Sequence, residues 1–283
     1  MPKLNSGRSL LVAGVLTAAA ASGQLAAQSE APVPDFSSKM AGWVNINTDF
    51  LPVAGAPAPT SNDPAHPYVS NQDARRAGVQ PTFRVADLTN PNLKPWAKEA
   101  MKRENDNVLA GKIAYTPRSS CMPAGIPAFL MFPVVEPIYF IQTPKEVTMI
   151  FEGDAQIRRV YLDVPHSANP KPSWYGESVG HYEGDTLVVD TIGLNNKTYL
   201  DNFRTPHSEK LHVVERWKLL DDMTLEVTLT VDDPETFHEP WKGDQPLSTD
   251  TAAEGERRSL RREQSNPVRL PHSGREQTRF LSG

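Results

Sequence analysis

Charged side chains occur on stretches of this sequence that otherwise show the alternating pattern of half-buried β-strands. Alternate residues of the stretch LHVVERWKLL share one face, and they are Leu211, Val213, Glu215, Trp217 and Leu219. A carboxylate among apolar neighbours needs a cationic partner or must take up a proton. Both states suit acid–base chemistry, so Glu215 is a candidate catalytic residue and Trp217 a candidate substrate contact.

The stretch AQIRRVYLD offers a cation for Glu215. Ile157, Arg159 and Tyr161 share a face, and its apolar members predict that this face points inward. We therefore expect Arg159 to lie beside Glu215 in the site, with Tyr161 contacting the substrate and Arg158 outside. The alternative is that Arg159 and Glu215 form an ion pair with a structural role only.

The stretch WYGESVGHYEGDTLVVDT predicts a hairpin with a tight turn at Glu183-Gly184. In this register Glu177 lies opposite Asp190. One face of the hairpin then carries Glu177, Val179, His181, Thr186, Val188 and Asp190. Such a mixed face fits the wall of a ligand pocket, with Asp190 in catalysis and Glu177 and His181 contacting the substrate. It also fits a solvated outer face.

Two histidines lie in Pro-His-Ser segments between predicted strands. His166 and His207 are candidate catalytic proton carriers at the mouth of a barrel, because loops there meet the substrate while the strands fix the geometry. The alternatives are two surface histidines or, with a carboxylate, a metal site. The sequence has no HxxxH or HxH spacing at these positions and no nucleotide-binding loop. We expect no metal and no other cofactor.

Other motifs and the composition argue against several classes of protein. Residues 176–180 match GxSxG in letters, but a serine hydrolase needs that motif between a strand and a helix, and here it lies within a hairpin. Cys121 is the single cysteine, so no internal disulfide can form, and no base is evident next to it. The 29 basic residues are dispersed in a chain of net charge −5, which argues against nucleic acid as a partner.

The elements that must position these residues are short strands. Seven runs of strand composition, separated by turn residues, are Val134–Thr143, Val147–Glu152, Gln156–Asp163, Trp174–Tyr182, Asp185–Thr191, Leu211–Leu220 and Leu225–Val231. With little helix between them, they predict a mainly β fold in which an antiparallel meander closes or nearly closes into a barrel. A two-sheet sandwich is the alternative.

Composition divides the rest of the chain. Residues 1–27 have the basic, apolar and small-residue layout of a cleavable signal peptide, so we expect a periplasmic or secreted protein whose mature chain has no integral membrane span. Residues 28–94 are Pro-rich and predicted to be extended. A helix at 95–110 precedes the strands of a barrel domain, residues 95–242. Residues 243–283 are predicted to be a flexible charged tail.

Five blocks within residues 90–242 follow one another in a fixed order, and they are CMPAGIPAF, IQTPKEVTMIFEGDAQIRRVYLD, WYGESVGHYEGDTLVVDTIGLN, PHSEKLHVVERW and DDPETFHEPW. In these blocks the sequence resembles a widespread family of exported bacterial proteins that has no generally assigned activity. The polar residues that match the family pattern are Arg159, Tyr161, Asp163, His166, His181, Asp185, Asp190, His207, Glu215 and Arg216. Val164-Pro165 replaces the usual Gly-Arg, and Tyr182 replaces a Trp, so the resemblance does not imply an arginine–anion contact at the first position. The likeness to lipocalin barrels is an architectural analogy.

These features lead to a functional expectation. We expect an exported, cofactor-independent lyase, isomerase or hydratase that transfers protons on a mainly apolar small molecule of phenolic or terpenoid character. The alternatives are a barrel that carries such a ligand without chemistry, and a structural envelope protein. Convergence of Glu215, Asp190, His166 and His207 on one pocket would favour catalysis. An apolar pocket without those groups would favour carriage, and a filled barrel would favour a structural role. The sequence leaves the oligomeric state open.

Overall fold

The computed structural model describes residues 32–37, 42–131, 136–153 and 156–249, all of which belong to the larger of the two units of the chain, residues 32–283. The predicted signal peptide lies outside these ranges, as does the part of the predicted tail beyond residue 249. In the described part of the chain, no helix has the length and apolar character needed to cross a membrane.

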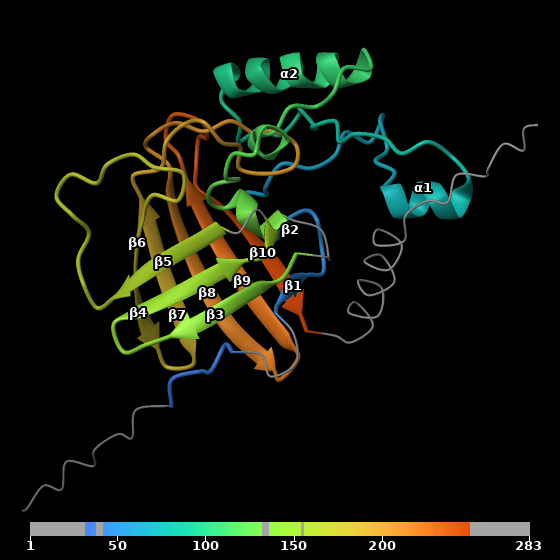
Figure 1. The fold of residues 1–283 in the computed structure, drawn as a ribbon. Coiled ribbons are helices and arrows are strands. Elements are labelled where there is room, and N and C mark those ends of the chain that lie inside the picture. The colour runs from blue at the N-terminus through green and yellow to red at the C-terminus, as the bar shows by residue number, and fades with distance from the viewer. Residues whose placement is uncertain (1–31, 38–41, 132–135, 154–155, 250–283) are drawn as a thin grey trace, which may run out of the picture. The chain divides into compact units, whose positions relative to one another are not determined.

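The described residues form a mainly β fold in which one sheet curls into a nearly closed barrel (Figure 1). The strands follow the order β1-β10-β9-β8-β7-β6-β5-β4-β3, and β2 pairs with β10. Their bounds are β1 Val44–Asn45, β2 Leu51–Pro52, β3 Ile138–Gln142, β4 Glu146–Phe151, β5 Gln156–Leu162, β6 Glu177–Glu183, β7 Thr186–Ile192, β8 His212–Asp221, β9 Thr224–Asp232 and β10 Trp241–Ser248. Trp43, next to β1, exchanges two backbone hydrogen bonds of 2.8 Å with Ile138 of β3, which links the two ends of the sheet. The predicted mainly β, nearly closed barrel is confirmed.

One pair of neighbouring strands departs from a pure meander. β5 and β6 are parallel, with Tyr161 opposite Val179, whereas the other paired strands are antiparallel. Parallel neighbours need a long crossover connection, and residues 163–176 supply it. This crossover brings His166 to Glu177 at the start of β6.

The two Glu-Gly-Asp segments join paired antiparallel strands, as predicted, but the second turn has a different register. It consists of Gly184 and Asp185, one residue later than predicted, and Gly184 has φ +61°. Glycine takes the first position of the turn because positive φ is required there. Asp190 therefore lies opposite Val179 and not opposite Glu177.

β10 corrects the predicted end of the barrel. Residues 243–248, which the composition assigns to the flexible tail, make up most of this strand and pair with β9. Its alternate residues Gly243, Gln245 and Leu247 are buried. The alternation is hard to see in the sequence because glycine and glutamine at inward positions carry no hydrophobic signal.

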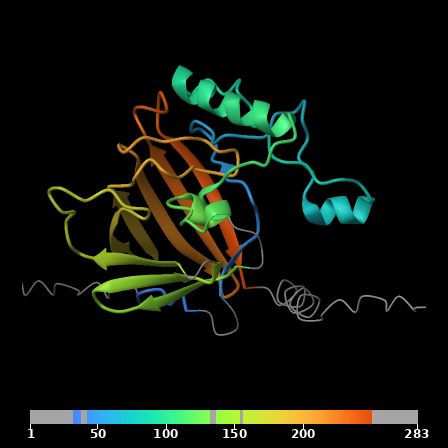
Figure 2. The same ribbon diagram turned by 45° about the horizontal axis from the view of Figure 1, so that its top comes forward.

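Two helices lie outside the barrel, and a short helical turn packs into its core (Figures 1 and 2). α2, Pro95–Leu109, confirms the predicted helix, and α1, Asn71–Ala77, lies within the segment predicted to be extended. The 3-10 turns η1, Pro117–Ser120, and η2, Ala128–Met131, connect α2 to β3. Phe129, Leu130 and Met131 of η2 belong to the same buried cluster as Trp217. Side chains from η2 therefore help to fill the barrel.

Candidate functional site

Glu215 lies inside the barrel, as its alternation predicts, but its partner is Arg158. Arg158 Nη1 donates to Glu215 Oε1 at 3.0 Å, and Nη2 donates to Oε2 at 2.5 Å. The same guanidinium donates to Ser178 Oγ at 3.2 Å and to Thr191 Oγ1 at 2.8 Å. The buried pair is thus hydrogen-bonded to polar neighbours as well as to itself, which is the condition for keeping two charges in a core.

The face of β5 that carries Arg159 is the outer one. The Arg159 side chain is 62% exposed, and its Nε lies 3.7 Å from Glu146 Oε1. Tyr161 is also exposed, so neither residue can join Glu215 in a site. The inward residues of β5 are Arg158, Val160 and Leu162. The predicted inward face is wrong because β5 has apolar residues on both faces, and alternation alone does not distinguish them.

The space around the Arg158–Glu215 pair is filled. Trp217 is fully buried, and its ring centroid lies 5.3 Å from that of Phe140 and 6.4 Å from that of Phe129. The cavity beside Arg158 has a volume of about 10 Å³, enough for one water molecule. The interior next to Glu215 is therefore packed core, and Trp217 is a core residue.

Three predicted site residues meet on the outer surface of β6 and β7. His166 Nδ1 lies 3.1 Å from Glu177 Oε1, and its Nε2 lies 2.9 Å from Asp190 Oδ1. Each ring nitrogen of His166 thus faces a carboxylate oxygen, which accepts hydrogen bonds. His212 Nε2 donates to the same Asp190 oxygen at 2.9 Å. We name these residues, His166, Glu177, Asp190 and His212, the outer histidine cluster.

The outer histidine cluster fastens the crossover to the sheet. The Ser167 backbone N–H donates to Glu177 Oε1 at 2.6 Å, and its hydroxyl donates to the other oxygen. These bonds lower the pKa of Glu177, and the hydrogen bond from His212 lowers the pKa of Asp190. Carboxylates held in the ionised form by several donors are poor proton acceptors. Among the described residues, no group of three or more His, Cys, Asp and Glu is arranged to hold a metal ion.

Two other predicted residues lie apart from this cluster. His181 is exposed on the outer surface, with Nε2 3.0 Å from Glu183 Oε1. His207 is buried, with Nδ1 3.0 Å from the Ser208 carbonyl and Nε2 2.7 Å from Thr198 Oγ1. A carbonyl only accepts, so Nδ1 carries the proton and Nε2 accepts from the threonine hydroxyl. Burial lowers the pKa of His207, which keeps the ring neutral.

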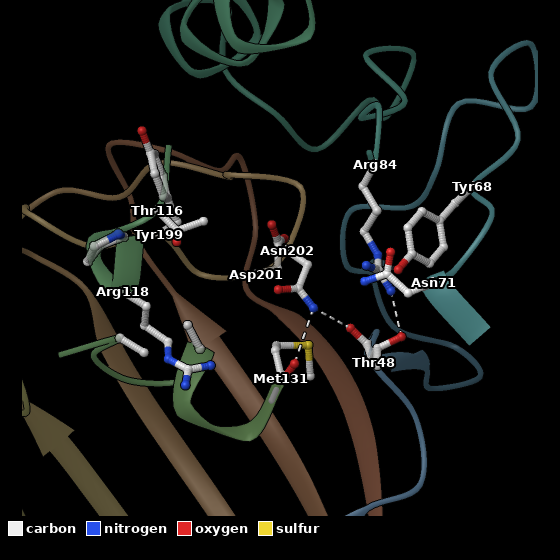
Figure 3. A pocket seen from close by; sticks show the side chains of 13 residues that line it. Thr48, Tyr68, Asn71, Arg84, Thr116, Arg118, Met131, Tyr199, Asp201 and Asn202 are labelled. Atoms are coloured by element: carbon white, nitrogen blue, oxygen red, sulfur yellow. Dashed lines mark hydrogen bonds between the residues drawn. The ribbon is translucent and has the colours of Figure 1, made fainter. Parts of the chain in front are cut away.

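A cleft at one end of the barrel was not identified from the sequence (Figure 3). This rim cleft has two compartments of about 310 and 330 Å³. The residues that line both compartments are Tyr68, Asn71, Arg84, Thr116 and Asn202. Ala124, Ala128 and Met131 provide apolar wall in the first compartment. A cleft of this size with apolar walls and a few polar groups is typical of small-molecule sites.

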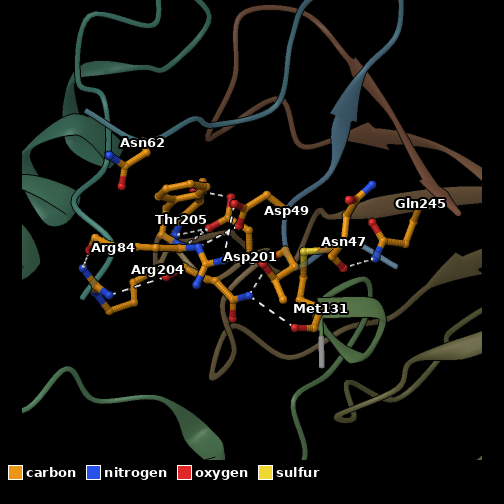
Figure 4. Close-up of polar contacts among 12 residues, drawn as sticks. Asn47, Asp49, Asn62, Arg84, Met131, Asp201, Arg204, Thr205 and Gln245 are labelled. Atoms are coloured by element: carbon orange, nitrogen blue, oxygen red, sulfur yellow. Dashed lines mark hydrogen bonds and ion pairs between the residues drawn. The ribbon is translucent and has the colours of Figure 1, made fainter. Parts of the chain in front are cut away.

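Asp201 brings a titratable carboxyl group to the first compartment. Its Oδ1 accepts from the backbone N–H groups of Phe203 at 2.9 Å and Thr205 at 3.1 Å, and its Oδ2 accepts from Thr205 Oγ1 at 2.7 Å (Figure 4). Burial outweighs these hydrogen bonds and raises the pKa of Asp201 to about 6. A carboxyl group with a pKa close to neutral can both donate and accept a proton.

Three arginines line the rim cleft, and each has an acidic neighbour. Arg84 Nε donates to Asp49 Oδ1 at 2.7 Å, and the guanidinium carbon lies 3.9 Å from the centroid of the Tyr68 ring. Arg118 Nη2 donates to Glu136 Oε1 at 2.8 Å. The third, Arg204, is 2% exposed, and its Nε lies 4.0 Å from Glu104 Oε2. Acidic side chains accept hydrogen bonds from Arg84 and Arg118, whereas the buried Nε of Arg204 has no hydrogen-bond partner among the described residues.

The buried His207 supports the wall of the rim cleft without lining it. Its hydrogen bond to Thr198 joins the two ends of the loop that carries Tyr199, Asp201 and Asn202 to the cleft. Within that loop, the Leu200 N–H donates to the Thr205 carbonyl at 2.9 Å. His207 therefore stabilises the loop that carries three residues of the cleft wall. The sequence signal for this region is weak, namely a run of polar residues, DNFRTPHS, in a connection between two strands.

Comparison of the chain with models of protein families, with curated proteins and with solved structures found no match.

Proposed function

We propose that this protein is exported and acts in the rim cleft on a small, mainly apolar molecule, as a lyase, isomerase or hydratase that uses acid–base chemistry. In this proposal Asp201 replaces Glu215 as the proton-transferring residue. The observation that carries it is a carboxyl group with its pKa raised to about 6 in the wall of a ligand-sized cleft. Membership of the exported family that the sequence resembles is part of the same proposal.

The lining of the cleft supports a ligand of phenolic or terpenoid size. A volume of about 310 Å³ lies at the lower end of the range for small-molecule sites. Burial raises the pKa of Tyr199, so its hydroxyl stays protonated and can donate to a ligand oxygen. The Asn202 amide oxygen can accept from a ligand, whereas its Nδ2 already donates to the Thr48 carbonyl at 2.8 Å and to the Met131 carbonyl at 3.2 Å. These groups can orient a ligand whose body rests on the apolar wall.

Asp201 Oδ2 is the better oxygen for proton transfer. Oδ1 accepts two backbone hydrogen bonds, whereas Oδ2 accepts one, from Thr205. Oδ2 therefore retains a lone pair that can take a proton from the ligand and return it at another position. Such a step moves a proton within the site and needs no redox group.

Binding without conversion is the second candidate. Asp201 already accepts three hydrogen bonds inside its own loop, a pattern that also stabilises turns. In that case the raised pKa would be a consequence of burial with no catalytic use. The packed barrel interior means that a carried ligand would also occupy the rim cleft.

The test combines metabolite capture with turnover. Purified protein is incubated with a metabolite extract, retained compounds are identified, and each is assayed for conversion by wild type and by Asp201→Asn. We expect the Asn variant to keep binding and to lose about 10²- to 10⁴-fold in turnover, while Asp222→Asn, an exposed turn residue, behaves as wild type. Retention by wild type and by Asp201→Asn with no turnover by either supports carriage.

The location of the site is tested separately. Ala128 lines the cleft and is partly exposed, so Ala128→Phe fills space in the cleft without opening the core. Binding that is unchanged in a folded Ala128→Phe variant contradicts the rim cleft as the ligand site.

A further inference from the structure

The outer surface of β3, β4 and β5 carries a contiguous group of four apolar side chains, Tyr139, Ile141, Ile150 and Ile157, and Tyr161 lies beyond Arg159 on β5. Tyr139, Ile141, Ile157 and Tyr161 are 41%, 51%, 55% and 45% exposed. The strand register places Tyr139 opposite Ile150, and Ile150 opposite Ile157, so these three side chains form a row across three strands. We name the five residues Tyr139, Ile141, Ile150, Ile157 and Tyr161 the β3–β5 patch. Exposed apolar residues on monomeric proteins are normally scattered, and a continuous group marks a contact surface.

The rest of the barrel surface is built differently. The outward residues of β8 and β9 are polar or charged along most of their length, and examples are His212, Arg216, Lys218, Glu226 and Thr228. In both ribbon views, α1 and α2 lie away from the wall formed by β3, β4 and β5 (Figures 1 and 2). The outward residues of β6, β7 and β8 include Val179, Val188 and Val214, but charged residues lie between them, and no helix of the described chain covers the Tyr139–Ile150–Ile157 row.

The charges within this wall have both signs. Arg159 lies between the apolar rows, opposite Thr148, and its nearest acid is Glu146 at 3.7 Å. Glu152 lies at the other end, where the Tyr139 hydroxyl donates to its Oε2 at 3.4 Å. In a two-fold symmetric dimer the same surface of each copy forms the contact. Cations of one copy can meet anions of the other only if that surface carries both. The wall that carries the β3–β5 patch meets this requirement through Arg159, Glu146 and Glu152, which lie next to the patch.

We propose that the β3–β5 patch is the contact between two copies of this chain in a symmetric dimer. Two sheet faces pack at about 10 Å with a shallow crossing angle, which lets the Tyr139–Ile150–Ile157 rows of the two copies interdigitate. In such a dimer Arg159 of one copy can meet the acidic residues of the other. A stable contact involves roughly 20–30 residues a side, so it extends to neighbours such as Val164, which is 47% exposed.

A membrane surface is a less suitable partner for the β3–β5 patch than a second copy of the chain. Surfaces that bind anionic lipid are usually rich in lysine and arginine around the apolar residues. Here Glu146 and Glu152 accompany Arg159, and the chain has a net charge of −5. The patch also shares no residue with the lining of the rim cleft, so the proposed dimer does not depend on the proposed function.

The experiment is sedimentation velocity of the purified full chain over a concentration series. We expect a species of twice the chain mass in wild type. Ile157→Glu and Ile141→Lys each place a charge in the contact and should weaken dimerisation by about 100-fold or more. The matched control is Leu220→Glu, because Leu220 is 52% exposed and lies outside the patch, and this variant should remain dimeric.

Circular dichroism and a cooperative melting transition establish that each variant is folded. Two substitutions are used so that failure of one to fold leaves the other as a test. A wild-type protein that stays monomeric at its highest soluble concentration overturns the proposal. Dimers that persist in a folded Ile157→Glu or Ile141→Lys variant overturn it as well, because they place the contact elsewhere.

Discussion

Arg158 and Glu215 form a two-point ion pair inside the barrel, with Nη1–Oε1 and Nη2–Oε2 distances of 3.0 and 2.5 Å. Both side chains are almost completely buried. Ser178 and Thr191 take further guanidinium donors, and the Arg158 guanidinium carbon lies 5.2 Å from the centroid of the Phe129 ring. The pair thus connects β5, β6, β7 and β8 with η2 at the centre of the fold. Because the pair lies in packed core, we infer that it stabilises the fold.

Glu215→Gln should lower the free energy of unfolding by about 3–5 kcal/mol, because it leaves the Arg158 charge buried without its counter-charge. Chemical denaturation at neutral pH measures this change. Arg76→Ala is the matched control, since the Arg76 side chain is 70% exposed and lies outside the barrel, and it should change stability by no more than about 0.5 kcal/mol. Equal stability of wild type and Glu215→Gln would contradict a structural role for the pair.

Asp201 should make the protein less stable as the pH rises from about 4 to about 6. Its folded pKa of about 6 exceeds the ordinary value of 3.8, so the folded state binds the proton more tightly than the unfolded state does. This contribution favours folding at low pH and is lost through that window, with a full effect of roughly 3 kcal/mol. Urea unfolding of wild type and Asp201→Asn between pH 4 and 8 measures it.

The stability difference between Asp201→Asn and wild type should therefore shift in favour of the variant as the pH rises. A difference that stays constant across the series would show that Asp201 titrates normally. It would also remove the observation that carries the proposed acid–base function.

His212 should titrate above its ordinary pKa of 6.5, because the hydrogen bond to Asp190 favours the charged ring. Its contribution to stability is complete below pH 6.5 and is lost as the pH rises through the folded pKa. NMR titration of the imidazole signals measures this value. Asp190→Asn should return the pKa of His212 towards 6.5, whereas Glu183→Gln, which affects the contact with His181, should leave it unchanged. No response to Asp190→Asn would refute the outer histidine cluster as described.

Thr198→Val should destabilise the protein by about 1–3 kcal/mol, because it leaves the buried Nε2 of His207 without a donor. Thr198→Ser keeps the hydroxyl and should recover most of this loss. The same pair of variants tests whether His207 acts on the rim cleft through its loop. If the loop shapes the rim cleft, ligand affinity should fall in the Val variant and return in the Ser variant. Affinity that is unaffected by Thr198→Val would limit His207 to a structural role.

Export predicts a mature chain that begins close to Gln28, because residues 1–27 have the layout of a signal peptide. N-terminal sequencing of protein recovered from outside the cytoplasm checks this. Intact Met1 or Pro2 in cytoplasmic protein is the outcome that contradicts export.

The fold class and the inward position of Glu215 could be predicted from local patterns in the sequence. Strand alternation is a property of adjacent residues, and in β8 one face is clearly apolar, so the inward direction follows from the sequence. The same rule assigned Arg159 wrongly, because β5 has apolar residues on both faces. Its outer apolar residues belong to the β3–β5 patch, and only the closed sheet shows which side faces solvent.

The rim cleft could not be predicted from the sequence, because only the tertiary structure brings its residues together. Its wall combines Thr48, Arg84, Arg118 and Asp201, which come from segments far apart in the chain. No periodic pattern in the sequence relates such residues, because they come together only when residues 48–84 and η1 pack at the end of the barrel. The raised pKa of Asp201 also depends on the folded structure, because burial removes the carboxyl group from water and Asp49, which is remote in sequence, raises the pKa further.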